Sequence, residues 1–169
     1  MRSAQYTQRF CRTLTTVAAR DPGFEKRVRD SFGRQSFMGL IGARIELVEP
    51  GRCAIRVPFR ADLCQQHGFI HAGVTTAIAD TAAGYAAYSV FPATSSILTV
   101  EFKINLLAPA EGDELLARAR VIRSGKTITV VQSDVFGVRA TSEKQVAAMQ
   151  ATMMCLHDTP DVASSANAP

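Results

Sequence analysis

The chain has 169 residues, of which 47% are apolar and 20% are charged, a composition typical of one globular domain with at most a small appendage. No apolar run reaches the roughly 18 to 20 residues that a membrane-spanning helix needs, so we expect no membrane insertion. The four cysteines and three histidines show no metal-ligand spacing. We therefore expect no metal site, and free thiols in a reducing compartment such as the cytoplasm.

The net charge of +4 is concentrated at the N-terminus. Residues 1–36 contain eight Lys or Arg against three Asp or Glu, whereas residues 37–169 contain eleven against twelve. A nucleic-acid-binding domain needs a basic face on its folded body, usually with aromatic residues. Because this body is near neutral and the chain has no Trp, we expect no nucleic-acid partner.

Residues 1–36 are predicted to form a basic helical extension. Apolar residues recur at helical spacing across residues 4–20, and Asp21 followed by Pro22 predicts the start of a second helix that ends near Phe32. The first twenty residues contain four Arg and no acidic residue. This pattern also suits a transit peptide, which leaves the mitochondrial matrix as an alternative location.

From residue 37 the sequence alternates between apolar and polar residues, which is typical of antiparallel strands with one buried face. In the first long alternating segment, Leu98, Val100, Phe102, Ile104 and Leu106 are expected to share that face. One helix interrupts the strands, so the predicted class is α+β. Residues 37–157 form the predicted domain and residues 158–169 a disordered tail. The predicted strands are Ala43–Val48, Cys53–Phe59, Ile97–Leu107, Glu114–Arg123, Thr127–Val138 and Val146–Leu156.

The helix predicted over residues 72–89 is small and apolar around its whole circumference, so we expect it to be buried by a curved sheet. Its single charge is Asp80, and a buried carboxylate is costly unless it is paired, hydrogen-bonded or protonated. Asp80 is therefore either a structural residue that accepts a hydrogen bond, from Thr81 or Thr99 for example, or a functional carboxylate.

The loop before this helix ends at His71, and the helix begins at Ala72 and Gly73. Backbone N–H groups in the first turn of a helix have no intrahelical partner and can bind a carbonyl oxygen or an oxyanion. Small residues at this position let a substrate approach the backbone. His71 itself is read as a residue that orients the loop, with catalysis as the alternative.

The segment Gln65–Gly73 followed by Asp80 resembles the signature of the PaaI-like hot-dog thioesterases. That family typically has an Asn, then His-Gly-Gly six residues later, and an Asp nine residues after the His. Here Gln65 replaces the Asn and Ala72 replaces the first Gly. The resemblance covers residues 37–156 and implies the hot-dog fold, an antiparallel sheet wrapped around one central helix, to which the N-terminal helices are an addition.

The resemblance also implies an acyl-CoA or aryl-CoA thioesterase, with coenzyme A as part of the substrate and no separate cofactor. The N–H of Ala72, with that of Gly73, would polarise the thioester carbonyl. Asp80 would act as general base or as nucleophile, supported by the hydroxyl of Thr99. Gln65 and His71 would position the thioester or the loop.

Ala72 and Asp80 are eight residues apart, which is about 12 Å along a helix, so one carbonyl cannot contact both in one chain. We therefore expect a homodimer or homotetramer whose sites combine two chains. Arg123 and Lys126, at a predicted turn, either bind CoA phosphates or are simply solvated. A non-catalytic acyl-CoA or lipid-binding protein and an enoyl-thioester hydratase remain as alternatives.

Overall fold

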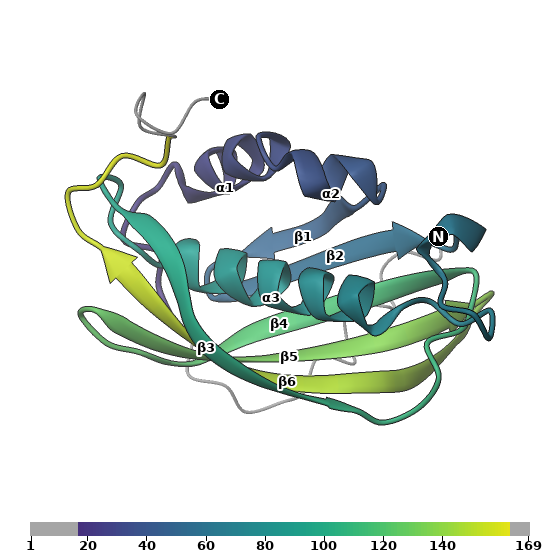
Figure 1. Ribbon diagram of the computed structural model, residues 1–169. Helices are drawn as coiled ribbons and strands as arrows, with labels where there is room; N and C mark the ends of the chain where they lie inside the picture. The colour runs from purple at the N-terminus through teal and green to yellow at the C-terminus, as the bar shows by residue number, and fades with distance from the viewer. Residues whose placement is uncertain (1–16, 163–169) are drawn as a thin grey trace.

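In the computed structural model, which describes residues 17–162, six antiparallel strands form one sheet that curves around helix α3 (Figure 1). The strand order is β1-β2-β4-β5-β6-β3, which leaves β1 and β3 at the edges. The predicted α+β arrangement of a sheet around one central helix is confirmed. The elements are α1 (Phe24–Gly33), α2 (Ser36–Leu40), β1 (Arg44–Glu49), β2 (Arg52–Pro58), the 3-10 turn η2 (Ala61–Leu63), α3 (Ala72–Tyr88), β3 (Ser96–Leu106), β4 (Glu114–Ser124), β5 (Ile128–Arg139) and β6 (Ser142–Leu156).

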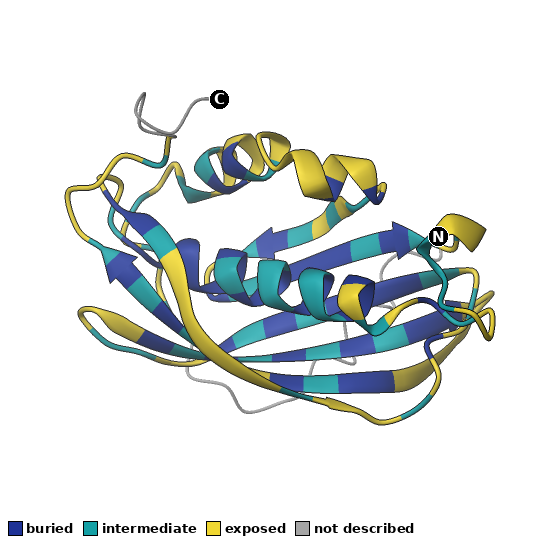
Figure 2. Cartoon of the chain, in the orientation of Figure 1, coloured by how far each residue is buried: buried dark blue, intermediate teal, exposed yellow. Residues whose placement is uncertain are grey.

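Helix α3 is the centre of the hydrophobic core, as its composition predicts. Ten of its 17 residues are buried, and the sheet approaches it closely because most of those side chains are small (Figure 2). Ile78, Ala79, Ala82 and Ala83 are fully buried against the inner face of the sheet. The predicted inward set on β4, comprising Leu115, Ala117, Ala119 and Val121, is also buried.

The prediction for β3 is wrong in one respect, because the strand contains a β-bulge. Thr99 pairs with Met153 of β6 and Glu101 with Thr152, so Val100 is one extra residue with no partner. A bulge reverses the alternation along the rest of its strand. Thr99 therefore shares the helix-facing side of the sheet with Phe102, whereas Leu98 does not.

The N-terminal helix begins later than predicted. The Oδ1 atom of Asp21 accepts a hydrogen bond from the N–H of Gly23 at 2.8 Å, so these residues form a turn and α1 starts at Phe24. Residues 17–20 are not helical, and residues 4–16 of the predicted first helix lie outside the described residues. Helix α2 was not predicted, since five residues are too few to show a helical period.

Strand β6 begins at Ser142, four residues before the predicted start, because exposed polar residues pair there with the end of β5. Across residues 17–162, no helix is both long and apolar enough to cross a membrane. Over the same range, no three His, Cys, Asp or Glu side chains gather as metal ligands would. The domain boundaries at 36 and 157 stay predictions, as does disorder of the tail, whose last seven residues lie outside the described part.

Arg27 makes the largest set of polar contacts between helix α1 and the C-terminal end of α3. Its guanidinium donates hydrogen bonds to the carbonyl oxygens of Tyr88, Phe91 and Pro92 at 2.9–3.2 Å. It also pairs with Asp21 at 3.0 Å and lies 4.1 Å from the centre of the Tyr88 ring. A cation is favourable here because the carbonyl groups at a helix C-terminus lack intrahelical partners.

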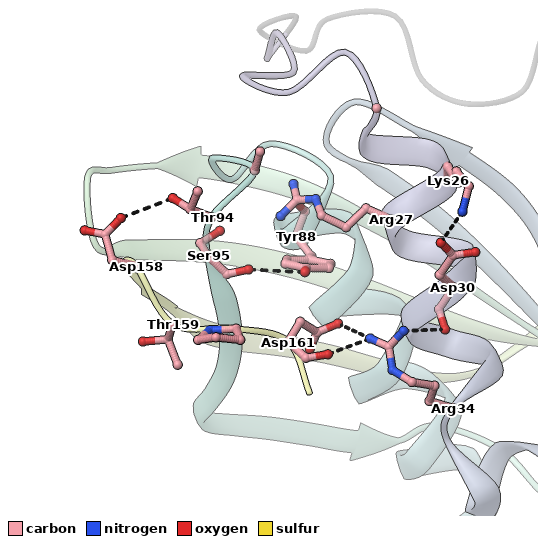
Figure 3. A pocket seen from close by; sticks show the side chains of 13 residues that line it. Lys26, Arg27, Asp30, Arg34, Tyr88, Thr94, Ser95, Asp158, Thr159 and Asp161 are labelled. Atoms are coloured by element: carbon pink, nitrogen blue, oxygen red, sulfur yellow. Dashed lines mark hydrogen bonds and ion pairs between the residues drawn. The ribbon is translucent and has the colours of Figure 1, made fainter. Parts of the chain in front are cut away.

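A cavity of about 650 Å³ opens between α1, the end of α3 and the segment after β6 (Figure 3). The cations along its wall are already paired, Lys26 with Asp30 and Arg34 with Asp161, in addition to Arg27. This cavity lies at the opposite end of α3 from the loop that precedes it. The charged side chains of its wall make ion pairs and hydrogen bonds that join α1 to the end of α3 and to the segment after β6.

We predict that Arg27→Ala lowers the free energy of unfolding by about 2–4 kcal/mol, because it leaves Asp21 and three carbonyl groups at and just after the end of α3 without their cation. The matched control is Lys26→Ala on the same helix. The side chains of Lys26 and Asp30 are 82% and 53% exposed. Removing such a pair changes stability by about 0.5 kcal/mol or less. Urea unfolding of both variants tests the difference, and equal effects would contradict the role of Arg27.

Candidate functional site

The first turn of α3 borders a cavity of about 240 Å³ with mostly apolar walls. The loop that leads into it is held by an isolated bridge between Cys64 and Ile70, and it turns at Gly68, whose φ of +83° favours glycine. Small apolar pockets with a few polar groups are typical ligand sites. The lining residues are Gln65, Phe69, Ile70, Ala72, Thr75, Leu106, Ala108, Pro109, Ala110 and Val146.

His71 caps α3. Its Nδ1 atom accepts a hydrogen bond from the N–H of Gly73 at 2.8 Å, and its carbonyl oxygen accepts from Val74. The side chain therefore stabilises the helix start, while its predicted part in orienting the loop or in catalysis stays a prediction. One consequence is that the N–H of Gly73, a predicted oxyanion donor, is already occupied.

Ala72 is the first residue of α3 and is half-buried in the cavity wall. Within residues 17–162, positive φ values at non-glycine residues occur at Ala140 and Asp158, so Ala72 has an ordinary helical backbone. Replacing the family's glycine with alanine therefore adds a methyl group without backbone strain. No hydrogen bond within that range uses the Ala72 N–H, which is left to bind a ligand.

Gln65 lines the same cavity, and its side-chain oxygen accepts a hydrogen bond from the N–H of His67. Its backbone also closes the loop, since its N–H donates to the carbonyl of Phe69 and its carbonyl accepts from Gly68. Gln65 thus holds the loop beside the start of α3. Of the two roles predicted for Gln65, the described contacts are those of a residue that shapes the loop.

Asp80 is half-buried on α3 and accepts a hydrogen bond from the Thr99 hydroxyl at 2.9 Å. The β3 bulge makes this contact available, because it keeps Thr99 on the helix-facing side of the strand. Burial raises the pKa of Asp80 above its ordinary 3.8, and the hydrogen bond from Thr99 opposes that rise. A carboxyl group with a raised pKa and one fixed donor is suited to proton transfer near neutral pH.

The predicted site residues fall into separate groups in one chain. Gln65, His71, Ala72 and Gly73 lie together at the start of α3, while Asp80 and Thr99 form a second group about 12 Å along the helix. Arg123, near the end of β4, and Lys126, in the turn between β4 and β5, are exposed. This turn lies at the end of the sheet where α3 finishes (Figure 1). The chain does not bring this turn to the cavity.

Two other groups, the Cys53 thiol and the Thr75 hydroxyl, differ in what they can contribute to a reaction. Burial raises the pKa of the Cys53 thiol to about 12, so this cysteine is not a nucleophile at neutral pH. Thr75, which sequence reasoning missed, lines the cavity with a buried hydroxyl. The signal that points to it is spacing, because Thr75 lies three residues after Ala72 and so on the same side of the helix.

Comparison with known proteins gives consistent matches. The sequence profile of the Thioesterase superfamily matches residues 67–140. SSO2140 of Saccharolobus solfataricus, which carries an esterase name, is 31% identical over 85 residues. Those residues make up 50% of this chain and 60% of SSO2140, so the match spans three fifths of that relative.

Among solved structures, a thioesterase family protein from Silicibacter pomeroyi is 44% identical, with a TM-score of 0.78. The alignment covers 80% of this chain and 99% of that protein. The PaaI protein of the E. coli phenylacetic acid degradation operon is 22% identical over 80% of this chain and 95% of its own, with a TM-score of 0.73. At that identity, the likeness to PaaI shows a shared fold.

We predict that Thr99→Val raises the pKa of Asp80 further, because it removes the hydroxyl that stabilises the carboxylate and leaves the desolvation in place. Threonine and valine have nearly the same shape, so the packing around position 99 is preserved. An NMR titration of the Asp80 carboxyl carbon measures the change. A Thr99→Ser control, which keeps the hydroxyl, should titrate like the parent protein, and a lower pKa in Thr99→Val would contradict this assignment.

Proposed function

Because this chain belongs to the thioesterase superfamily and has the PaaI-like hot-dog fold, we propose that it hydrolyses acyl-CoA or aryl-CoA thioesters to the free acid and CoA. The observation that carries the proposal is the pair of polar groups that α3 presents, one backbone N–H and one carboxylate. Asp80 is the one charged residue of this helix, which also presents an N–H at Ala72 that has no partner among residues 17–162. Coenzyme A enters as part of the substrate, and the reaction requires no further cofactor.

In the proposed reaction the thioester carbonyl oxygen binds at the start of α3, where the Ala72 N–H and the helix dipole stabilise negative charge. The Asp80 carboxylate takes a proton from a water molecule whose oxygen attacks the carbonyl carbon. The tetrahedral intermediate then collapses and the carbon–sulfur bond breaks. The proton on Asp80 passes to the departing sulfur, which leaves CoA thiol and the carboxylic acid.

A nucleophilic role for Asp80 uses the same atoms differently. The carboxylate attacks the carbonyl carbon directly, the CoA thiolate leaves, and water hydrolyses the resulting mixed anhydride. Thr99 serves both routes by holding one carboxylate oxygen, so that the other faces the substrate or the water. Single-turnover hydrolysis in ¹⁸O-labelled water tests for the nucleophilic route, since label enters Asp80 when water attacks its carboxyl carbon in the anhydride and never enters it on the general-base route.

A complete site needs two chains, because the two groups of polar atoms lie about 12 Å apart along one helix. Strand β3 offers the surface for that assembly. It is a sheet edge of 11 residues with exposed apolar side chains, and such an edge is a template for pairing with another strand (Figure 2). The exposed apolar residues are Leu98, Val100, Phe102 and Leu106, which are 41–57% exposed.

Antiparallel pairing of two β3 strands also solves the distance problem. A two-fold axis that crosses β3 at Phe102 sets the two Phe102 residues opposite each other. Because Val100 is an extra residue, Thr99 of one chain then lies opposite Ile104 of the other, two residues before Leu106 on the same face. Leu106 lines the cavity at the start of α3, and Thr99 holds Asp80. The proposed dimer, alone or within a tetramer, thus brings the carboxylate of one chain to the Ala72 N–H of the other.

The same arrangement gives Arg123 and Lys126 a role. In one chain the turn between β4 and β5 lies at the end of the sheet where α3 finishes, whereas the cavity lies at the start of α3 (Figure 1). Antiparallel α3 helices in a dimer bring that end toward the other chain's cavity. We include both cations in the proposal as residues that bind the CoA phosphates.

We expect Asp80→Asn to reduce the rate of thioester hydrolysis by about a hundredfold or more while leaving the protein folded. A raised pKa means that ionisation of Asp80 opposes folding once the pH rises above the unfolded-state value. The neutral amide removes that cost, so the melting temperature at pH 7 should equal or exceed that of the parent. Release of free thiol from short, long and aryl CoA esters measures the rate, and differential scanning calorimetry the stability.

The two measurements also separate the alternatives. Normal turnover with a lower melting temperature would make Asp80 a structural residue. A parent protein that binds acyl-CoA but hydrolyses none of the esters would be the non-catalytic binding protein, for which the replacements at Gln65 and Ala72 are the sequence argument.

We expect Phe102→Lys to convert the oligomer to monomers and to abolish hydrolysis, because two lysines would face each other near the two-fold axis. The control is Ile122→Lys on β4, which places the same charge on an exposed apolar position away from the β3 edge. Light scattering gives the mass of each variant. A parent protein that is monomeric at micromolar concentration and still hydrolyses thioesters would contradict the two-chain site.

A further inference from the structure

The Thr75 side chain is 1% exposed, yet its hydroxyl has no hydrogen-bond partner among residues 17–162. Buried hydroxyl groups in native proteins are nearly always hydrogen-bonded, and exceptions concentrate where a ligand or water completes the bonding. Thr75 lines the cavity at the start of α3. An occupant of that cavity is therefore the natural partner of this hydroxyl.

The usual internal partner is already used. A threonine within a helix commonly donates its hydroxyl to the carbonyl four residues earlier, which here is that of His71. That carbonyl oxygen instead accepts the N–H groups of Val74, at 3.0 Å, and of Thr75 itself, at 3.3 Å. The hydroxyl of Thr75 is thus left without a partner among residues 17–162, in a residue that lines the cavity.

The hydroxyl also lies beside the other available donor. Ala72 and Thr75 are three residues apart, so they lie on one face of α3, about 4.5 Å apart along its axis. Side chains on a helix lean toward its N-terminus, which carries the Thr75 hydroxyl back over the first turn. Both residues line the same cavity of about 240 Å³.

A tetrahedral oxyanion is best stabilised by two converging donors, and the neighbouring backbone group cannot be the second. The N–H of Gly73 donates to the Nδ1 atom of His71 at 2.8 Å. We propose that the Thr75 hydroxyl is the second donor, and that it holds the thioester oxygen together with the Ala72 N–H. The hydroxyl keeps its proton throughout, so the reaction above is unchanged. This inference rests on the proposed thioester hydrolysis and adds a catalytic residue to it.

The test compares Thr75→Val, which keeps the shape and removes the hydroxyl, with Thr75→Ser, which keeps the hydroxyl. With the best CoA ester for the parent protein, we expect Thr75→Val to lower kcat by about a hundredfold or more and to leave KM within about threefold. Thr75→Ser should retain most of kcat. The matched control is Ser133→Ala on β5, which removes another buried hydroxyl that has no partner among residues 17–162 and should leave kcat unchanged.

Stability separates catalysis from packing. Thr75→Val replaces an unsatisfied hydroxyl with a methyl group, so its melting temperature should equal or exceed that of the parent. An unchanged kcat in Thr75→Val, or an equal loss of kcat in Thr75→Ser, would overturn the role of the Thr75 hydroxyl and would leave the proposed thioester hydrolysis standing. A parent protein that hydrolyses no CoA ester would overturn the proposed function and this inference with it.

Discussion

Close packing of the sheet onto α3 is the constraint on which the rest of the structure depends. The helix fits beneath the curved sheet because alanines occupy half of its buried positions. Such a helix has little polar surface, so any polar group on it is costly to desolvate. Its first turn and Asp80 are the exceptions, and both lie where the sheet leaves the helix partly open. The proposed chemistry is therefore confined to the places that packing does not seal.

The β-bulge at Val100 links this packing to the carboxylate. Without it, strict alternation would turn Thr99 away from α3 whenever Phe102 faces it. With the extra residue both face the helix, and the Thr99 hydroxyl reaches Asp80. The bulge also ends the regular alternation that would bury Leu98, so the edge strand keeps apolar side chains exposed. One local irregularity thus accounts for the support of Asp80 and for part of the surface on which the proposed dimer rests.

The sequence predicted the elements whose pattern is long and regular. The length of α3, the inward face of β4 and the pairing of Asp80 with Thr99 as one of two candidate hydroxyls all followed from periodicity and desolvation. The bulge could not be predicted, because a single inserted residue leaves the alternation of the letters intact and changes only which strand positions pair. The predicted start of α1 was too early because Asp21 accepts a hydrogen bond from Gly23 in a turn rather than capping the helix. An Asp-Pro pair occurs both in turns and at helix starts, so the sequence does not distinguish the two.

The first turn of α3 shows why residue identity alone was insufficient at the site. Its sequence offers two backbone donors, at Ala72 and Gly73, and nothing in the letters distinguishes them. The structure does, because the His71 ring turns back to cap the helix and occupies the second donor. A cap on the Gly73 N–H fixes the helix start but removes a donor from the site. The Thr75 hydroxyl one turn later is buried, has no partner in the described part of the chain and lies on the same face of α3, so it is the donor proposed to restore the pair. On this view His71 and Thr75 are complementary, since the cap that orders the loop makes a side-chain donor necessary.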